Sequence, residues 1–471
     1  MFGDIYVQSL LVLLYMKRDA IDLGKAEIPV LFRKYLLPTL FGMLSLCAVT
    51  ATDGIFVGRG VGSDALAAVN ICIAPTMVMM GIGLMLGVGA SVCASIHLAN
   101  DNVKAARLNI TQAMGVATIV VLLFIASTLS FPDTTGRLLG SSEQLMPLVR
   151  EYMPWIFVTC LFQIWCAIGL FVVRLDGSPG YAMWCNVIPG IMNILLDYLF
   201  IFPLDMGLKG AALATCISCF VGGMMVLGYL GVLAATLRLI RIKLSVKSLR
   251  LTLRNIGYQC KIGISALLGE ATMGVLMLMG NLMFMRYMGE DGVGAFSIAC
   301  YYCPFVFMIG NAIAQSAQPI ISYNYGLGDR LRVAATERLA ILCAIACGVV
   351  VTAAFTLFPA SMVGLFLDGI SPAAGIATAG FPVFSTAFVF YIFNLTAIGY
   401  FQSIENAIPS VVFALLRGCV FLVPSFIVMP LLLGDNGIWL SLTVSEILTS
   451  MSIIGYYLYQ RRHSRQVVSS R

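Results

Sequence analysis

The stretch YLLPTLFGMLSLCAVTATDGIFVG, from Tyr35 to Gly58, contains a single charged residue, Asp53. A helix of about 20 apolar residues is long enough to cross the roughly 30 Å of hydrocarbon in a bilayer. A charged side chain within such a helix is costly, so it is a candidate for a functional group. The stretch therefore predicts a membrane-spanning helix that carries an acid in its interior.

Similar apolar stretches recur along the whole chain. Of its 471 residues, 60% are apolar and 11% are charged, and the mean hydropathy is +0.96. This is too little charge to cover the surface of a soluble protein. We predict an all-α polytopic membrane protein with twelve transmembrane helices, near residues 35–58, 65–98, 108–131, 148–174, 179–202, 209–237, 260–287, 292–324, 333–358, 376–402, 407–430 and 436–460.

The two halves of the chain resemble each other. Residues 64–71 (DALAAVNI) align with residues 291–298 (DGVGAFSI), and Asn100-Asp101 aligns with Gly328-Asp329. Six spans per repeat is an even number, so both copies have the same orientation and are related by an axis along the membrane normal. We therefore expect two pseudo-symmetric six-helix bundles with a cavity between them, an architecture that suits alternating access.

The spans also predict the domain organisation. We expect an N-terminal segment, an N-lobe, a basic linker, a C-lobe and a basic tail, at residues 1–28, 29–237, 238–259, 260–460 and 461–471. Lys and Arg are concentrated on the side of both termini, which predicts a multi-pass protein of the cell inner (plasma) membrane with both termini cytoplasmic. The apolar stretch before Met16 is too short to span. It lies on the interface or precedes the true start, and the sequence Met16-Lys-Arg-Asp favours the second.

Several function classes lack the residues that they need. The cysteine pairs with CxxC spacing, Cys216/Cys219 and Cys300/Cys303, lie on predicted spans, without a redox or metal-binding context. The chain has only two histidines, and we find no nucleophile–base pair and no phosphate-binding motif. We therefore expect a protein that is not an enzyme and has no cofactor or metal centre apart from a coupling ion, Na⁺ or H⁺.

Five ionisable residues fall within predicted spans: Asp53, Asp197, Glu270, Arg417 and Glu446. Asp53 and Asp197 each lie about five residues before the outer end of an outward-running span. Thr215 lies about six residues after the outer start of an inward-running span, at a similar depth. Asn193 precedes Asp197 by one helical turn and shares its face. These oxygen-bearing groups predict one site for Na⁺ or a proton.

Two neighbouring carboxylates in a low-dielectric pocket cannot both stay ionised without a counter-cation. They take up a proton, bind Na⁺ or hold a cationic substrate, and competition among these outcomes is what an antiporter requires. The alternative is that a neighbouring hydroxyl or backbone group simply satisfies each side chain. The sequence favours the cation site for Asp53 and Asp197, and leaves both interpretations open for Thr215.

The second half offers further candidates. Glu270 is either a second carboxylate facing the cavity or a paired or snorkelling acid. Arg417 and Glu446 lie near mid-depth on adjacent antiparallel spans, which favours a structural ion pair over a role in substrate binding. Methionine and aromatic side chains line adaptable pockets for flat cations, although most of them pack helices or face lipid. The candidates for lining the cavity are Met273, Met277, Gln315, Tyr391 and Asn394.

Several motifs carry a resemblance to a known family over about residues 28–460. They are TDGIFVG at 52–58, VGSDALAAV at 61–69, VRLDGSP at 173–179, NILLD at 193–197, GAALAT at 210–215 and QSAQPIISYNYG at 315–326. In these motifs the chain resembles the MATE (multidrug and toxic compound extrusion) transporters and, among them, the MepA-like branch.

The resemblance implies roles for individual residues. It marks Asp53, Asn193, Asp197 and Thr215 as a first-lobe cation site, which would hold Na⁺ if Na⁺ is the coupling ion. Glu270 resembles the span-seven acid of some members. Those members also carry an acid in span ten, where this chain has none and where Tyr391 and Asn394 are the nearest polar groups.

Together, the residues and the resemblance predict a cation-coupled efflux antiporter for cationic, amphipathic organic compounds. We expect small organic cations and membrane lipid as its partners, no nucleic acid, no required protein partner and a monomeric state. The main alternatives are a lipid-linked oligosaccharide flippase and an exporter of a specific metabolite. A flippase would line its cavity with Arg and Lys, and the predicted spans contain almost none apart from Arg417. A passive channel would not need a buried pair of carboxylates.

Overall fold

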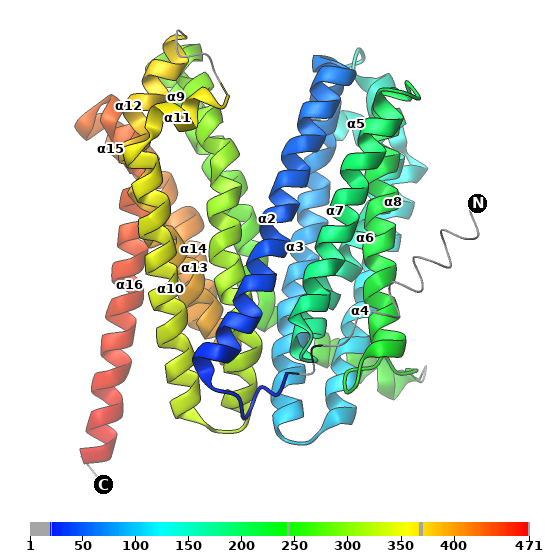
Figure 1. The fold of residues 1–471 in the computed structure, drawn as a ribbon, viewed down its shortest axis with the longest axis vertical. Coiled ribbons are helices and arrows are strands. Elements are labelled where there is room, and N and C mark those ends of the chain that lie inside the picture. Colours follow the sequence, from blue (N-terminus) through cyan, green and yellow to red (C-terminus); the bar gives the residue numbers. More distant parts are fainter. Residues whose placement is uncertain (1–18, 20, 243–244, 367–370, 470–471) are drawn as a thin grey trace. The chain divides into compact units, whose positions relative to one another are not determined.

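The computed structural model describes residue 19 and residues 21–242, 245–366 and 371–469. The apolar stretch before Met16 lies outside the described residues. Within the described ranges the secondary structure is helical, without a β-strand, as Figure 1 shows. This agrees with the predicted all-α fold, because a helix satisfies its own backbone hydrogen bonds and can therefore cross lipid.

The first repeat contains six long helices. Proline occupies the first turn of several of them, where its fixed φ suits a helix start. A short additional helix, which the sequence did not predict, joins the third and fourth of the six. The elements are α2 (Ile28–Gly60), α3 (Ser63–Ala99), α4 (Val103–Ser130), α5 (Pro132–Leu138), α6 (Met146–Leu175), α7 (Pro179–Ile201), α8 (Gly207–Gly228) and the π-helical turn η1 (Tyr229–Leu233).

The second repeat follows the same order with more interruptions. Its elements are α9 (Val246–Gly326), α10 (Arg330–Leu357), α11 (Pro359–Gly364), α12 (Pro372–Ser385), α13 (Ala387–Ser403), α14 (Ala407–Leu415), the π-helical turn η2 (Leu416–Val420), α15 (Leu422–Leu433) and α16 (Asp435–Ser469). The residues at the end of the predicted basic linker form the beginning of α9.

The described helices supply the twelve expected spans. Ten helices are long and apolar enough to cross a membrane, and the pair α12 and α13, bent by 46°, makes one more. Helix α9 is 81 residues long and consists of two helices joined at Gly289, whose φ of 66° is not helical. Because α9 therefore contains two spans, the described chain has twelve, which confirms the predicted fold class.

The repeat is visible in the backbone. Positive φ angles occur at Gly62 and Gly289, at Asp101 and Gly328, and at Gly207 and Gly434. The same spacing along the sequence separates all three pairs. These are the turn positions of the repeat, where only glycine, or more rarely Asp or Asn, adopts a left-handed conformation at little cost. Two copies of the same helix–turn pattern therefore follow each other in the chain.

One predicted alignment within the repeat is shifted by a residue. Asn102 accepts a hydrogen bond from Ala105 N at the start of α4, and Asp329 accepts one from Arg332 N at the start of α10. Both are helix-capping residues. The structure therefore aligns Asn102, and not Asp101, with Asp329.

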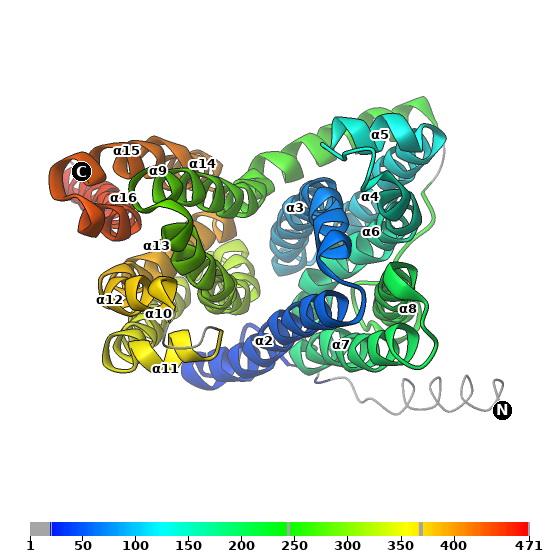
Figure 2. The ribbon, with the colours of Figure 1, turned by 90° about the horizontal axis from the view of Figure 1, so that it is seen from above.

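The chain divides into two compact units. Unit 1 comprises residues 1–267 together with Pro319–Val333, and unit 2 comprises Leu268–Gln318 together with residues 334–471. Within unit 1, α2 lies along α7 and α3 lies along α6, as can be followed in Figure 2. The beginning of α9 also belongs to unit 1, because Gln259 donates to Asn109 Oδ1 at 2.9 Å and Gly263 packs directly against the backbone of Met85.

Candidate cation and substrate sites

Asp53 and Asp197 meet inside unit 1. They come from α2 and α7, which lie side by side, and Asp197 is completely buried. The two carboxyl groups interact directly with each other. Two ionised carboxylates in such proximity repel each other in a low-dielectric interior, so the pair favours a proton or a cation. The structure thus brings together the two acids that the sequence placed at the same depth.

Apart from this mutual contact, the buried carboxyl oxygens lack donors. Oδ1 of Asp53 and both oxygens of Asp197 have no hydrogen-bond partner among the described residues. Capping by a neighbouring hydroxyl or backbone group, the alternative interpretation, is therefore not what the structure displays. A buried acceptor without a donor is costly, which makes these oxygens suitable for a proton or a metal cation.

Asn193 and Thr215 lie next to each other in the same unit. Asn193 Nδ2 donates to Thr215 Oγ1 at 3.5 Å, and Thr215 Oγ1 donates to the Ala211 carbonyl at 3.1 Å. Asn193 is buried one turn before Asp197 on α7. Carboxylate, amide and hydroxyl oxygens are the ligands that a hard cation such as Na⁺ prefers. The four predicted residues therefore supply suitable chemistry from α2, α7 and α8.

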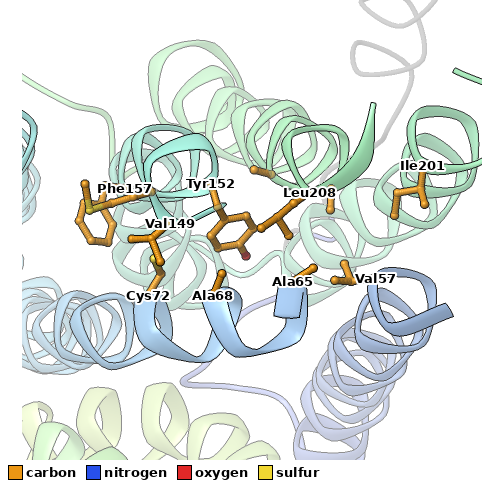
Figure 3. Packing of buried hydrophobic residues seen from close by; sticks show 12 residues of the cluster. Val57, Ala65, Ala68, Cys72, Val149, Tyr152, Phe157, Ile201 and Leu208 are labelled. Carbon is orange, nitrogen blue, oxygen red and sulfur yellow. The ribbon is translucent and has the colours of Figure 1, made fainter. Parts of the chain in front are cut away.

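Tyr152 is a neighbour of the acid pair that the sequence reasoning missed. It is 5% exposed on α6 and interacts electrostatically with both Asp53 and Asp197. Figure 3 shows its ring between Ala68 and Leu208, within a cluster of buried apolar side chains. These apolar side chains lower the local dielectric constant and so strengthen electrostatic interactions between Asp53 and Asp197. No motif marks Tyr152, because one aromatic residue in an apolar helix is usually a packing residue.

The predicted partners Arg417 and Glu446 form an ion pair in unit 2. Arg417 Nε donates to Glu446 Oε1 at 2.8 Å, and each side chain is 1% exposed. Asn394 Nδ2 donates to Glu446 Oε2 at 2.7 Å, and Ser450 Oγ donates to Asn394 Oδ1 at 2.8 Å. Helices α13 and α16 and the turn η2 are therefore joined by one buried polar network.

Tyr391 and Met273 extend this network. The guanidinium carbon of Arg417 lies 4.0 Å from the centre of the Tyr391 ring, and Tyr391 Oη donates to Met273 Sδ at 2.9 Å. Three cavity candidates, Met273, Tyr391 and Asn394, are thus buried and engaged in contacts within unit 2. The other two, Met277 and Gln315, are half-buried on α9.

Glu270 is half-buried on α9, one turn before Met273. No hydrogen bond or ion pair joins it to another described residue, so the structure does not place it in a pair. It shares unit 2 with the ion pair of Arg417 and Glu446.

The VRLDGSP motif acts as a structural anchor in unit 1. Arg174 is the last residue of the predicted span 148–174, and the structure buries it at the end of α6. Its carbonyl accepts a hydrogen bond from Tyr35 Oη at 2.9 Å. Asp176 accepts hydrogen bonds from the backbone of residues 235–237 and from Tyr229 Oη. A buried carboxylate is stable when several N–H groups satisfy it. The motif therefore fixes the chain after η1 against the turn between α6 and α7.

Comparison with known proteins supports both the repeat and the family. The MatE family model matches residues 38–199 and again residues 266–427, one match in each repeat. The multidrug export protein MepA of Staphylococcus aureus (strain MSSA476) is 25% identical over 427 residues, covering 90% of this chain and 93% of that protein. MepA of Staphylococcus saprophyticus is 25% identical over 432 residues, covering 90% and 91%.

Solved transporter structures share the fold. An outward-facing MATE family transporter of the MOP superfamily superposes with a TM-score of 0.85 at 22% identity, covering 95% of this chain and 98% of that one. The Vibrio cholerae MATE transporter VcmN gives a TM-score of 0.85 at 18% identity, covering 93% and 97%. These relatives are transporters and not enzymes. With the family model matching both repeats, this multi-pass membrane protein belongs to the MatE family of transporters.

Proposed function

We propose that the protein exports cationic, amphipathic organic compounds in exchange for H⁺ or Na⁺ by alternating access. The observation that carries this proposal is the contact between the Asp53 and Asp197 carboxyl groups, which have no hydrogen-bond donor for their buried oxygens among the described residues. Such a pair needs a proton or a cation in order to remain buried. A coupling ion and a cationic substrate that compete for this charge cannot both stay bound, which is the requirement for exchange.

The relatives and the charge distribution support further parts of the proposal. The relatives at 25% identity are named multidrug export proteins. The distribution of Lys and Arg favours a cell-membrane protein with both termini in the cytoplasm. The site would act on small organic cations within a monomer surrounded by lipid, with no protein partner required.

A flippase for lipid-linked oligosaccharides, or an exporter of one metabolite, remains the second candidate. One structural neighbour, a MOP superfamily transporter from Pyrococcus furiosus, is described as having a binding pocket of reversed polarity that suggests a different function. That protein is 21% identical, with a TM-score of 0.83. Among the described residues of this chain, the buried basic side chains are Arg174 and Arg417, and Arg417 is neutralised by Glu446. This charge balance favours cationic substrates over pyrophosphate.

Dye efflux in inverted membrane vesicles tests the proposal. Na⁺ and pH gradients are imposed separately, and the movement of a fluorescent organic cation is followed. We expect one of the gradients to drive transport of the dye and its reversal to reverse the movement. Vesicles carrying the Asp53→Asn protein serve as the control. Transport that is independent of both gradients, or the absence of any transport of cations, would contradict the proposal.

A further inference from the structure

The segment that precedes α2, residues 21–27, is held by the second repeat. The carbonyl of Leu23 accepts hydrogen bonds from Asn324 Nδ2 at 3.2 Å and from Arg332 Nη2 at 3.1 Å. Arg332 Nη2 also donates to the Ala26 carbonyl at 2.8 Å. Asn324 lies in the last turn of α9, and Arg332 lies in the first turn of α10. The segment therefore crosses from its own repeat to the turn between α9 and α10.

The same segment contacts the turn between α6 and α7. Ile21 N donates to the Gly177 carbonyl at 3.2 Å, and the Asp19 carboxylate, just before the segment, accepts from Gly180 N at 2.6 Å. A Cβ on Gly177 would lie only 2.7 Å from the Ile21 carbonyl oxygen. Helix α7 begins in this turn, and α2 begins directly after the segment. Residues 21–27 thus join the first turns of the two helices that carry the acid pair to the first turn of α10.

The second repeat has a similar crossing that is built differently. The beginning of α9 leads into the seventh span and is held by α4 of the first repeat, where Gln259 Nε2 donates to Asn109 Oδ1 at 2.9 Å. This crossing is a helix, and Gln259 is completely buried. Residues 21–27, in contrast, are not helical, and Leu23 is the only buried residue among them. A segment with few buried side chains opens at a lower free energy than a packed helix.

We propose that residues 21–27 form a releasable latch and that Arg332 is the residue that positions it. The closed latch ties the first turn of α10 to the first turns of α2 and α7. Helix α10 begins in unit 1, but from residue 334 onward it belongs to unit 2. Alternating access moves one bundle against the other, so α10 can follow unit 2 only when the latch opens. The helical crossing at the beginning of α9 stays closed. This inference rests on the proposed exchange mechanism.

A covalent lock tests whether the latch has to open. Gly24 lies in the latch, and a Cβ on it would lie 3.8 Å from Leu327 Cδ1, in the turn after α9. Gly24→Cys combined with Leu327→Cys therefore places two thiols within reach of a short crosslinker that a reductant cleaves. We expect efflux of a cationic dye to fall by about tenfold or more on crosslinking, because a blocked conformational step limits the whole cycle. Cleavage of the crosslinker should restore efflux.

Two controls separate the lock from other effects of the reagent. The single variants Gly24→Cys and Leu327→Cys, treated in the same way, report any reaction with the native cysteines. A second lock joins Gln112→Cys to Thr252→Cys, two positions whose side chains are hydrogen-bonded at 2.9 Å across the crossing of α4 and α9. This second lock should leave efflux unchanged, because that crossing does not open.

Hydrogen exchange in the unchanged protein provides a measurement that needs no variant. The backbone amides of residues 21–27 should exchange about tenfold faster in vesicles that are exporting dye than in resting vesicles, because opening exposes them to water. The amides at the beginning of α9 should exchange at the same rate in both. In Arg332→Gln the amides of the latch should already exchange rapidly in resting vesicles, whereas Arg330→Gln should behave like the unchanged protein.

The same measurements contain the results that would overturn the inference. Normal efflux after complete crosslinking of the latch would show that it does not open during transport. An equal loss of efflux from the lock between α4 and α9 would show that the two crossings do not differ. If the substitutions alone stop efflux, the exchange measurement decides, and equal rates in exporting and resting vesicles would refute the latch. Failure of the unchanged protein to export any organic cation would instead reject the proposed function.

Discussion

The carboxyl groups of Asp53 on α2 and Asp197 on α7 interact in the interior of unit 1, although 143 residues separate them in the sequence. One proton or one cation holds the pair together, because two neighbouring ionised carboxylates repel each other in a low-dielectric environment. Any step that removes the proton or the cation must therefore either separate α2 from α7 or admit a replacement.

Asp53→Asn should abolish coupling while preserving the fold. The amide can still donate a hydrogen bond to Asp197, so we expect normal amounts of protein in the membrane. The pair no longer requires a cation, and efflux driven by either a Na⁺ or a pH gradient should fall by about tenfold or more. Asp197→Asn should behave in the same way.

The matched control for these variants is Asp64→Asn, which changes an exposed acid at the start of α3. It should transport normally in the same vesicle assay. Full, gradient-dependent efflux by the Asp53→Asn protein would rule out the coupling role of the pair.

Arg417 and Glu446 should depend on each other for stability. Replacing either residue alone with alanine leaves one buried charge without its partner, which typically costs about 3–5 kcal/mol. Exchanging the two residues (Arg417→Glu/Glu446→Arg) restores opposite charges and should recover much of the lost thermal stability in detergent. Two independent defects without recovery in the exchanged protein would show that the pair contributes little as a pair.

Glu270→Gln should change which compounds are exported more than it changes the amount of protein. Removal of this charge should weaken efflux of organic cations by about two- to tenfold and leave uncharged substrates unaffected. The measurement is efflux of a cationic and an uncharged dye by the same vesicles. Equal losses for both dyes would indicate a structural role for Glu270.

Arg332 should stabilise the segment that precedes α2. Its Nη2 donates to the Leu23 carbonyl at 3.1 Å and to the Ala26 carbonyl at 2.8 Å, and its Nε donates to Asn324 Oδ1 at 2.9 Å. Arg332→Ala removes the donor to the Ala26 carbonyl and to Asn324 Oδ1, whereas the Leu23 carbonyl still accepts from Asn324 Nδ2 at 3.2 Å. We expect a loss of about 1–3 kcal/mol in the free energy of unfolding.

The exposed neighbour Arg330 provides the control, because Arg330→Ala removes the same charge without these contacts. The measurement is the melting temperature of both variants in detergent, which we expect to be lower for Arg332→Ala than for Arg330→Ala. A similar melting temperature for the two would mean that the contacts of Arg332 do not hold the segment.

The repeat could be recognised in the sequence, but its alignment at the helix ends could not. Asp101 and Gly328 have different side chains and occupy the same left-handed turn position. Sequence comparison aligns side chains, whereas the turn depends on backbone angles and on the caps supplied by Asn102 and Asp329. The prediction was therefore displaced by one residue.

The sequence by itself determined that the chain spans a membrane and how many spans it has, and it predicted a similar depth for Asp53 and Asp197. Lipid requires apolar segments of about 20 residues, and depth follows from the rise of 1.5 Å per residue along a helix. These are properties of single helices. They can be derived without knowing which helix lies beside which.

Only the tertiary structure decided which groups are partners. It brought Tyr152 to the acid pair, buried Arg174 and joined Arg417 to Tyr391 as well as to Glu446. It also showed that α9 consists of two helices joined at Gly289. These features depend on how each helix is rotated about its own axis and on how side chains from several helices fill one interior, and a nearly uniformly apolar sequence carries little information about either.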